Sequence, residues 1–294
     1  MKTITILSGK GGVGKSSITA SLAVILSKQK KIICADCDVD ASNLALVLGV
    51  EKYEEWNAIS TNQKVEFDLD KCNSCKKCFD SCYFDAIDWV NNKPKLKDFS
   101  CEGCGVCSMV CPKNAITGIN IKNAQLGYAK TRYGFTVVSA QLGIGQSGSG
   151  KVVTEVRKKA INLAEDAEIM LIDSAAGIGC PVIASIAGSD YVILVTEPTP
   201  SGFSDMKRAI AMVTHFKIPY GIIINKFDIN LEYIPKIESF AKEQDAKILV
   251  KLPYDKKFVE SLVNLTPIVS YDESKIKIFE EILDNIPLVR EGGE

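Results

Sequence analysis

The sequence predicts an α/β protein with a doubly wound, mostly parallel sheet and a small inserted α+β domain. Apolar strands alternate with amphipathic helices along most of the 294 residues, which is the pattern of a parallel sheet covered on both faces. A glycine-rich turn separates the first expected strand from the first expected helix. Eight of the eleven cysteines fall within residues 72–111 and break the alternation. This break indicates the insertion.

The regular elements follow from the spacing of apolar residues. The chain opens with a strand, a helix and a second strand, which together form a βαβ unit with a right-handed crossover. The expected strands are residues 3–7, 32–35, 168–172, 191–196, 221–224 and 247–252, with a hairpin at 122–138. The expected helices are residues 15–28, 151–165, 203–216, 231–242 and 274–285.

Two segments interrupt this regular order. Residues 53–64 are polar, aromatic and weakly patterned, so we expect a link there. The following stretch repeats the same cysteine spacing at an offset of 29 residues, which indicates an internal duplication. We therefore expect a discontinuous main domain over residues 1–60 and 121–294, interrupted by an inserted domain over residues 61–120.

Composition indicates a folded protein without a strong charge bias. Hydrophobic residues make up 46% of the chain and charged residues 24%, as in ordinary globular domains. The 35 basic and 36 acidic residues nearly cancel, which gives no global attraction to nucleic acid or acidic lipid. No apolar run reaches the roughly 18 residues that a membrane-spanning helix needs, and the N-terminal apolar stretch is too short for a signal peptide. We expect a cytoplasmic protein with no nucleic-acid partner and no membrane anchor.

The glycine-rich turn satisfies the phosphate-loop pattern, in the strand–turn–helix context that the motif requires. Glycines let successive backbone N–H groups turn inward around an anion, and the helix N-terminus adds partial positive charge. Lys15 is placed to reach the β- and γ-phosphates, and the Ser16 hydroxyl to coordinate Mg²⁺. The expected nucleotide-binding residues of this turn are Gly9, Gly11, Gly12, Val13, Gly14, Lys15, Ser16 and Ser17.

A second lysine, Lys10, stands among these glycines. The form Lys-Gly-Gly-x-Gly-Lys-Ser resembles the deviant phosphate loop of the MinD/ParA superfamily of ATPases, to which the nitrogenase iron protein is related. The resemblance implies catalytic roles for Lys10 and Lys15. It also implies a homodimer formed on ATP binding, in which Lys10 reaches the partner's nucleotide. The alternative for Lys10 is a solvated surface lysine.

Further segments resemble the same superfamily, each at the carboxyl end of an expected strand, where such sheets bind ligands. Two of them, residues 35–40 and 173–177, are here named the first and the second acidic segment. By position, Asp38 matches the aspartate that orients the attacking water, and Asp36 lies near the metal and Lys15. Asp173 matches the aspartate that holds the Mg²⁺ hydration shell, and Gly177 the glycine whose N–H approaches the γ-phosphate. The resemblance places contacts to the adenine base at Asn225, Pro253 and Asp255.

The duplicated cysteines match the signature of bacterial two-cluster ferredoxins. In that signature three closely spaced thiolates of one repeat and the fourth thiolate of the other repeat hold one [4Fe–4S] cluster. One cluster is expected on Cys72, Cys75, Cys78 and Cys111, and the second on Cys101, Cys104, Cys107 and Cys82. Zinc is the alternative, although zinc sites more often use two separated cysteine pairs.

Three cysteines and one glycine-rich segment lie outside these motifs. Cys34 falls in an expected buried strand, and Cys37 stands between two aspartates that disfavour a thiolate. Cys180 follows the second acidic segment, and for it, as for Cys37, a structural role is favoured over a metal or redox role. Residues 145–151 also fit a glycine-to-glycine-lysine spacing, but Val152 occupies the hydroxyl position and no strand leads directly into them. We expect a linker into a helix there.

Over nearly its full length the chain resembles MinD-superfamily ATPases with an inserted ferredoxin domain, related to Mrp/ApbC-type iron–sulfur carriers. The resemblance implies ATP, Mg²⁺ and two [4Fe–4S] clusters as cofactors. The leading hypothesis is nucleotide-gated electron transfer to a partner metalloprotein. One alternative is an ATPase that carries or assembles iron–sulfur clusters or metallocofactors. The other is a MinD-like positioning ATPase with redox-sensing clusters, which is disfavoured because residues 286–294 do not form a basic amphipathic helix.

Overall fold

The computed structural model describes residues 1–290, so residues 291–294 of the C-terminal stretch lie outside the described part. Nine strands form one sheet, with bounds β1 Lys2–Ser8, β2 Ile32–Cys37, β3 Glu55–Ile59, β8 Ala124–Lys130, β9 Thr136–Leu142, β10 Ile169–Ala176, β11 Tyr191–Thr196, β12 Tyr220–Asn225 and β13 Lys247–Leu252. Their spatial order is β13-β12-β11-β1-β10-β2-β9-β8-β3. The prediction of one large α/β sheet is confirmed.

Most of this sheet is parallel. The seven strands from β13 to β9 in the spatial order pair in parallel. The predicted hairpin is also present, because β8 pairs antiparallel with β9 and the edge strand β3 pairs antiparallel with β8. The central strand β10 is buried along nearly its whole length, as an apolar strand covered on both faces should be.

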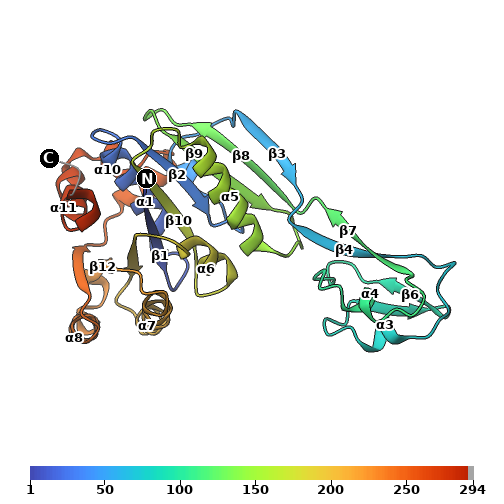
Figure 1. Ribbon diagram of the computed structural model, residues 1–294. Helices are drawn as coiled ribbons and strands as arrows, with labels where there is room; N and C mark the ends of the chain where they lie inside the picture. The colour runs from blue at the N-terminus through green and yellow to red at the C-terminus, as the bar shows by residue number, and fades with distance from the viewer. Residues whose placement is uncertain (291–294) are drawn as a thin grey trace.

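Helices cover both faces of the sheet (Figure 1). Their bounds are α1 Lys15–Leu26, α2 Leu44–Val47, α5 Ser149–Leu163, α6 Cys180–Ile186, α7 Pro200–His215, α8 Ile234–Glu243, α9 Lys257–Val263, α10 Ile268–Tyr271, α11 Ile276–Asp284 and α12 Pro287–Arg290. Along β1, Ile4 and Ile6 pack with α1 and α11, whereas Leu7 faces α7 on the other side. None of the helices in the described residues is long and apolar enough to cross a membrane.

Most element boundaries shift by a few residues from the sequence prediction, and two differences have a clear physical reason. The link expected at 53–64 was wrong, because this stretch contains β3 and the start of a further strand. As an edge strand β3 has no fully buried face, so its sequence lacks the alternation that identifies a strand. Helix α7 begins at Pro200, three residues before the predicted start, because the Thr199 hydroxyl accepts the Gly202 N–H at 3.0 Å and caps it.

Residues 62–121 form a lobe that extends away from the main sheet (Figure 1). Its elements are β4 Asn62–Phe67, α3 Lys77–Asp80, β5 Ile87–Val90, β6 Lys93–Leu96, α4 Val106–Met109 and β7 Ile116–Ile121. Strands β4 and β7 pair antiparallel and join the lobe to the rest of the chain, and β5 pairs with β6. Val65, Ile87 and Ile116 give the lobe a small apolar core of its own.

The two cysteine repeats have matching backbone geometry. Helices α3 and α4 each have four residues and each begins directly after a left-handed residue, Lys76 with φ 63° and Gly105 with φ 80°. Each of these residues stands between the second and third cysteine of its repeat. The internal duplication seen in the sequence is therefore also a structural duplication.

The packing of α11 yields a stability prediction. Phe279 of α11 is completely buried in the apolar cluster that includes α1. Phe279→Ala should therefore lower the free energy of unfolding by about 3–5 kcal/mol, because apolar burial is lost and a cavity forms. Phe216→Ala is the control, because Phe216 is 40% exposed and should cost less than about 1 kcal/mol. Urea unfolding followed by circular dichroism measures both. Equal losses would contradict this account of the core.

Candidate functional site

The phosphate loop leaves β1 and enters α1 directly after Gly14. Gly14 has a φ of 98°, and a Cβ there would lie 2.6 Å from the side-chain nitrogen of Asn225, so this position requires glycine. Gly12 has a φ of 77°, and neither Gly11 nor Gly12 has an atom within 4 Å of an added Cβ. This side of the loop is therefore open to a ligand.

A cavity of about 500 Å³ adjoins the loop, a volume within the range of small-molecule sites. Seven residues predicted from the sequence line it, namely Gly11, Gly12, Gly14, Lys15, Ser16, Ser17 and Asp38. The remaining lining residues were not predicted, namely Ala41, Asn43, Leu46, Val47, Leu262 and Leu265. Three of these are leucines that are partly exposed on α2 and around α9. They offer an apolar wall suited to the flat face of a nucleotide base.

Two carboxylates are buried next to each other at the carboxyl ends of adjacent strands. Asp36 on β2 and Asp173 on β10 are register neighbours, and both are fully buried. Burial and the charge of Asp173 raise the pKa of Asp36 to about 7. Asp36 accepts hydrogen bonds from the Ser42 hydroxyl at 2.6 Å and from the backbone N–H groups of Leu44 and Asp38 at 2.9 and 3.2 Å. Its oxygens thus hold the backbone that follows β2 in place.

Asp173 has one oxygen engaged and one free. Its Oδ1 accepts the Thr19 hydroxyl at 3.0 Å, whereas Oδ2 is buried without a hydrogen-bond partner among the described residues. Burial raises the pKa of Asp173, and Lys15 and the hydroxyls of Ser16 and Thr19 oppose this rise. A buried oxygen without a partner is a natural acceptor for a water or cation. With the neighbouring Ser16 it fits Mg²⁺, which usually keeps several waters and takes few protein ligands.

Lys15 and Asp38 face each other across the cavity. The Lys15 side chain is only 6% exposed, and its Nζ lies 3.9 Å from Oδ2 of Asp38. Burial raises the pKa of Asp38, and the positive charge of Lys15 opposes that rise. The N–H of Gly177, which was expected to approach the γ-phosphate, donates to the Ser8 carbonyl at 2.9 Å and so bonds the second acidic segment to β1. Its contact with a phosphate stays a prediction.

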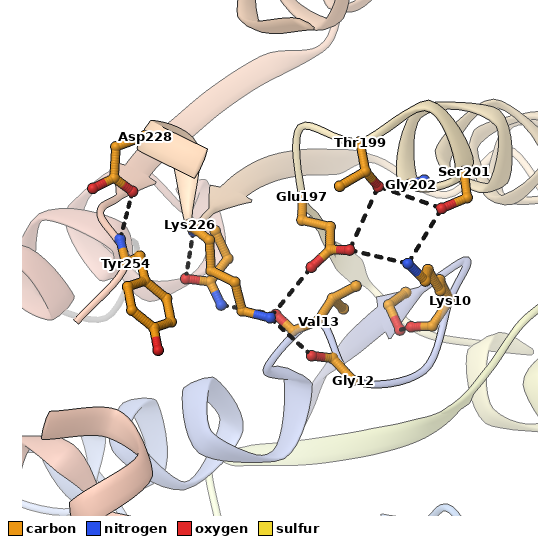
Figure 2. Close-up of polar contacts among 12 residues, drawn as sticks. Lys10, Gly12, Val13, Glu197, Thr199, Ser201, Gly202, Lys226, Asp228 and Tyr254 are labelled. Atoms are coloured by element: carbon orange, nitrogen blue, oxygen red, sulfur yellow. Dashed lines mark hydrogen bonds and ion pairs between the residues drawn. The ribbon is translucent and has the colours of Figure 1, made fainter. Parts of the chain in front are cut away.

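Lys10 is held within its own chain (Figure 2). Its Nζ lies 3.1 Å from Oε1 of Glu197 and 3.2 Å from the Ser201 hydroxyl. The other oxygen of Glu197 accepts from Lys226 at 3.2 Å, and Lys226 also donates to the Gly12 carbonyl at 3.2 Å. Glu197 was not predicted from the sequence. Its carboxylate links the phosphate loop to the residues after β11 and β12.

The residues predicted to contact the base lie outside the cavity lining. The amide nitrogen of Asn225 donates to the Val13 carbonyl at 2.8 Å and supports the phosphate loop. Asp255 forms an ion pair with Lys275 and accepts the N–H of Lys257 at 2.9 Å near the start of α9. Pro253 is exposed beyond β13. Base contacts by these three residues remain a prediction.

The lobe contains two small cavities, each lined by four cysteines. The first is lined by Cys72, Cys75, Cys78 and Cys111, and the second by Cys82, Cys101, Cys104 and Cys107. The structure thus brings together each group of four thiols that the sequence assigned to one cluster. All eleven cysteines of the chain are free thiols. Among residues 1–290, no three His, Cys, Asp or Glu side chains converge closely enough to suit one metal ion.

Backbone donors surround the cysteine sulfurs. The N–H of Ala86 points to Cys82 Sγ and the N–H of Ala115 to Cys111 Sγ, both at 3.3 Å. These are the fourth cysteines of the two repeats, and the donor lies four residues later in each case. Such hydrogen bonds stabilise thiolates, and four thiolates in an apolar pocket are the usual ligands of a [4Fe–4S] cluster. The donor set therefore fits a cluster in each cavity.

Comparison with known proteins connects this geometry to a family. Residues 4–268 match the model of the CobQ/CobB/MinD/ParA nucleotide binding domain. An uncharacterized protein of Methanocaldococcus jannaschii is 39% identical over 228 residues, covering 77% of this chain and 79% of the relative. An iron-sulfur cluster carrier protein of Pyrococcus abyssi is 26% identical over 301 residues, covering 96% of this chain and 84% of the relative.

The solved structure of the septum site-determining protein MinD complexed with Mg-ADP, from Pyrococcus horikoshii, has the same fold. It matches with a TM-score of 0.61 at 20% identity, covering 100% of this chain and 99% of that chain. The matched region of the family model includes the phosphate loop and both buried aspartates. This chain therefore belongs to the CobQ/CobB/MinD/ParA nucleotide-binding family, whose MinD and ParA members are ATPases.

Proposed function

We propose that the protein is an ATP-hydrolysing iron–sulfur protein in which bound nucleotide governs two resident [4Fe–4S] clusters. The main support is the grouping of eight free cysteines into two four-thiol cavities, on the same chain as an open phosphate loop. When bound, the clusters supply one-electron transfer. Residues 61–120 act as a two-cluster ferredoxin-like domain inserted into the ATPase.

In this proposal each residue of the nucleotide site has a separate task. The loop N–H groups and Lys15 bind the phosphates, and Ser16 and the free oxygen of Asp173 hold Mg²⁺ and its waters. Asp38 orients the attacking water, and its raised pKa favours accepting a proton. Asp36 positions Asp38 by accepting its N–H.

Dimer formation on ATP binding requires Lys10 to change partners. In the monomer Lys10 is bound by Glu197 and Ser201, so it must leave both before it reaches a partner's nucleotide. The negative charge of the phosphates and that of Glu197 compete for the same ammonium group. Glu197 therefore holds the monomer in a resting state.

The proposed function has two versions, electron transfer to a partner and transfer of an iron–sulfur cluster, and different observations favour each. The cysteine cavities favour electron transfer, because all eight lobe cysteines are committed to resident clusters. The relatives favour a carrier, since several are named iron-sulfur cluster carrier protein. Of the cysteines outside the lobe, Cys34 and Cys37 are buried and Cys180 is exposed. A transferable cluster would therefore be bridged by Cys180 of two protomers.

An assay that measures both the transfer of iron and the reduction of an acceptor distinguishes electron transfer from cluster transfer. Protein isolated anaerobically is reduced with dithionite, freed of excess reductant, and mixed with ATP and either an apo-ferredoxin or an oxidised metalloprotein acceptor, so that the reduced clusters are the electron donors. Electron transfer predicts reduction of the acceptor with all iron retained, and a faster rate with ATP than with ADP. Iron appearing in the apo-ferredoxin, and its loss in Cys180→Ala, would instead establish the carrier.

The cross-repeat ligand sets give a prediction for Cys111→Ala. One cluster should be lost, so bound iron should fall to about half of the wild-type value while the spectrum of a [4Fe–4S] cluster persists. Iron analysis and electron paramagnetic resonance after dithionite reduction measure this. Cys180→Ala is the control and should retain all the iron. Full retention in Cys111→Ala would refute the assignment.

The resting role of Glu197 gives a prediction for Glu197→Gln. The amide keeps the shape of the side chain but removes the charge that binds Lys10, which is partly exposed. The dimer formed with a non-hydrolysable ATP analogue should therefore tighten by about threefold, within the range of a partly exposed ion pair. Analytical ultracentrifugation measures the dissociation constant. Glu238→Gln, which removes the surface partner of Lys251, is the control, and a weaker Glu197→Gln dimer would contradict the resting role.

A further inference from the structure

We propose that residues 143–150, the glycine-rich segment from the end of β9 to the first two residues of α5, couple the nucleotide site to the second cysteine cavity. We call this stretch the coupling segment. The proposal rests on the proposed function, because it names the part of the chain through which nucleotide state reaches the lobe. The sequence alone indicates only a linker here. The contacts of the segment indicate that it also connects the nucleotide site to the lobe.

At one side the coupling segment adjoins both acidic segments of the nucleotide site. Leu142, the residue before it, donates its N–H to the Val39 carbonyl at 2.9 Å, one residue after Asp38. At its other end, a Cβ on Gly150 would lie 3.2 Å from both Cβ and the carbonyl oxygen of Cys180. Cys180 begins α6, three residues after Gly177. A movement of either acidic segment therefore displaces an end of the coupling segment.

The middle of the coupling segment is bonded to the base of the lobe. The Ser147 hydroxyl accepts from the Asn62 amide at 2.8 Å, and the Ser147 carbonyl accepts from the Asn123 amide at 3.1 Å. Asn62 begins β4, and Asn123 lies just after β7. Gly145 packs so closely on Phe99 that a Cβ would lie 2.4 Å from the ring. The segment thus contacts the first residue of β4 and the stretch that follows β7, where the lobe joins the main sheet.

The lobe residues next to the coupling segment adjoin the second cysteine cavity but do not line the first. Gly103, between Cys101 and Cys104, packs on β4, where an added Cβ would lie 2.2 Å from the Gln63 carbonyl and 3.3 Å from the Asn62 side-chain oxygen. Gly103 lines the second cavity, and neither Asn62 nor Phe99 nor Gly103 lines the first. Asn62 therefore contacts the coupling segment with one end of its amide and the cysteine loop with the other.

The composition of the coupling segment suits two alternative arrangements. Four of its eight residues are glycine, and Gly145 and Gly148 have φ of 65° and 93°. Its bonds to the lobe are polar and side-chain mediated, so they can be exchanged without opening an apolar core. The buried Oε1 of Gln146 has no hydrogen-bond partner among the described residues. A second arrangement of the segment that gives this oxygen a hydrogen bond would offset part of the free energy needed to leave the present arrangement.

Hydrogen exchange on the full-length protein with its clusters tests the coupling directly. Amides 101–104 should differ by at least about threefold in exchange rate between ADP and a non-hydrolysable ATP analogue. The matching amides of the first repeat, 72–75, should differ less and serve as the internal control. In Gly145→Ala the added methyl group displaces the segment from Phe99, so the difference at 101–104 should disappear while ATP hydrolysis and iron content stay at wild-type values.

Two further variants show whether the effect of Gly145→Ala is specific, the first as a control and the second as an independent test. Gly134→Ala changes another glycine with positive φ, in the β8–β9 turn, where a Cβ meets nothing within 4 Å, and it should keep the full response. Ser147→Ala removes the bond to Asn62 without adding bulk and should reduce the response. The proposed coupling is refuted if the exchange rates of amides 101–104 do not depend on nucleotide in the wild type. It is also refuted if they still depend on nucleotide in both Gly145→Ala and Ser147→Ala.

Cluster potentials measured on the same samples separate this inference from the proposed function. A nucleotide-dependent potential that persists in Gly145→Ala and Ser147→Ala would refute the coupling segment and leave the proposed function standing. An exchange response without any change in potential or electron delivery would retain the coupling segment. That result would refute nucleotide control of electron transfer.

Discussion

The burial of two acidic side chains next to each other constrains the whole nucleotide site. Asp36 and Asp173 are completely buried on paired strands, and burying charge is costly unless it is compensated. Asp36 is compensated within the protein by three hydrogen-bond donors, whereas one oxygen of Asp173 has no hydrogen-bond partner within residues 1–290. The positive charge of Lys15 offsets part of the remaining cost. In the proposed function, Mg²⁺ with a nucleotide would supply the rest, so ligand binding would relieve an electrostatic cost that the fold itself creates.

This constraint also explains why the site can act as a switch. The three donors to Asp36 belong to the segment that follows β2, and the bond from Gly177 to Ser8 fastens the second segment to β1. In the proposed function, a cation arriving at Asp173 changes the charge felt by Asp36, and the γ-phosphate competes with the Ser8 carbonyl for the Gly177 N–H. Both acidic segments are thus held by groups that the ligand perturbs directly. Rearrangement then needs only an exchange of hydrogen bonds and leaves the apolar core intact.

The sequence predicts features that depend on local spacing and misses those that depend on tertiary contact. The phosphate loop, the parallel strands and the cysteine repeats each have their pattern within a short stretch. The apolar wall from Leu46 and Leu262 was missed because α2 and α9 are too short for helical periodicity and meet only in the folded chain. Glu197 was missed for the same reason, since a single acidic residue after a strand carries no pattern. Asn225 was predicted to contact the base, and its support of the phosphate loop through the Val13 carbonyl was not foreseen, because that contact joins residues far apart in the sequence.

The separate cores of the lobe and the main sheet limit how bound nucleotide could influence the two cysteine cavities. Val65, Ile87 and Ile116 pack inside the lobe, in a cluster distinct from those beneath the sheet. Units with their own cores move relative to each other unless a large apolar interface joins them. Here β4, β7 and polar contacts such as Asn62–Ser147 make the connection. Such a junction transmits a change in position at small energetic cost, as the proposed nucleotide control of the lobe requires.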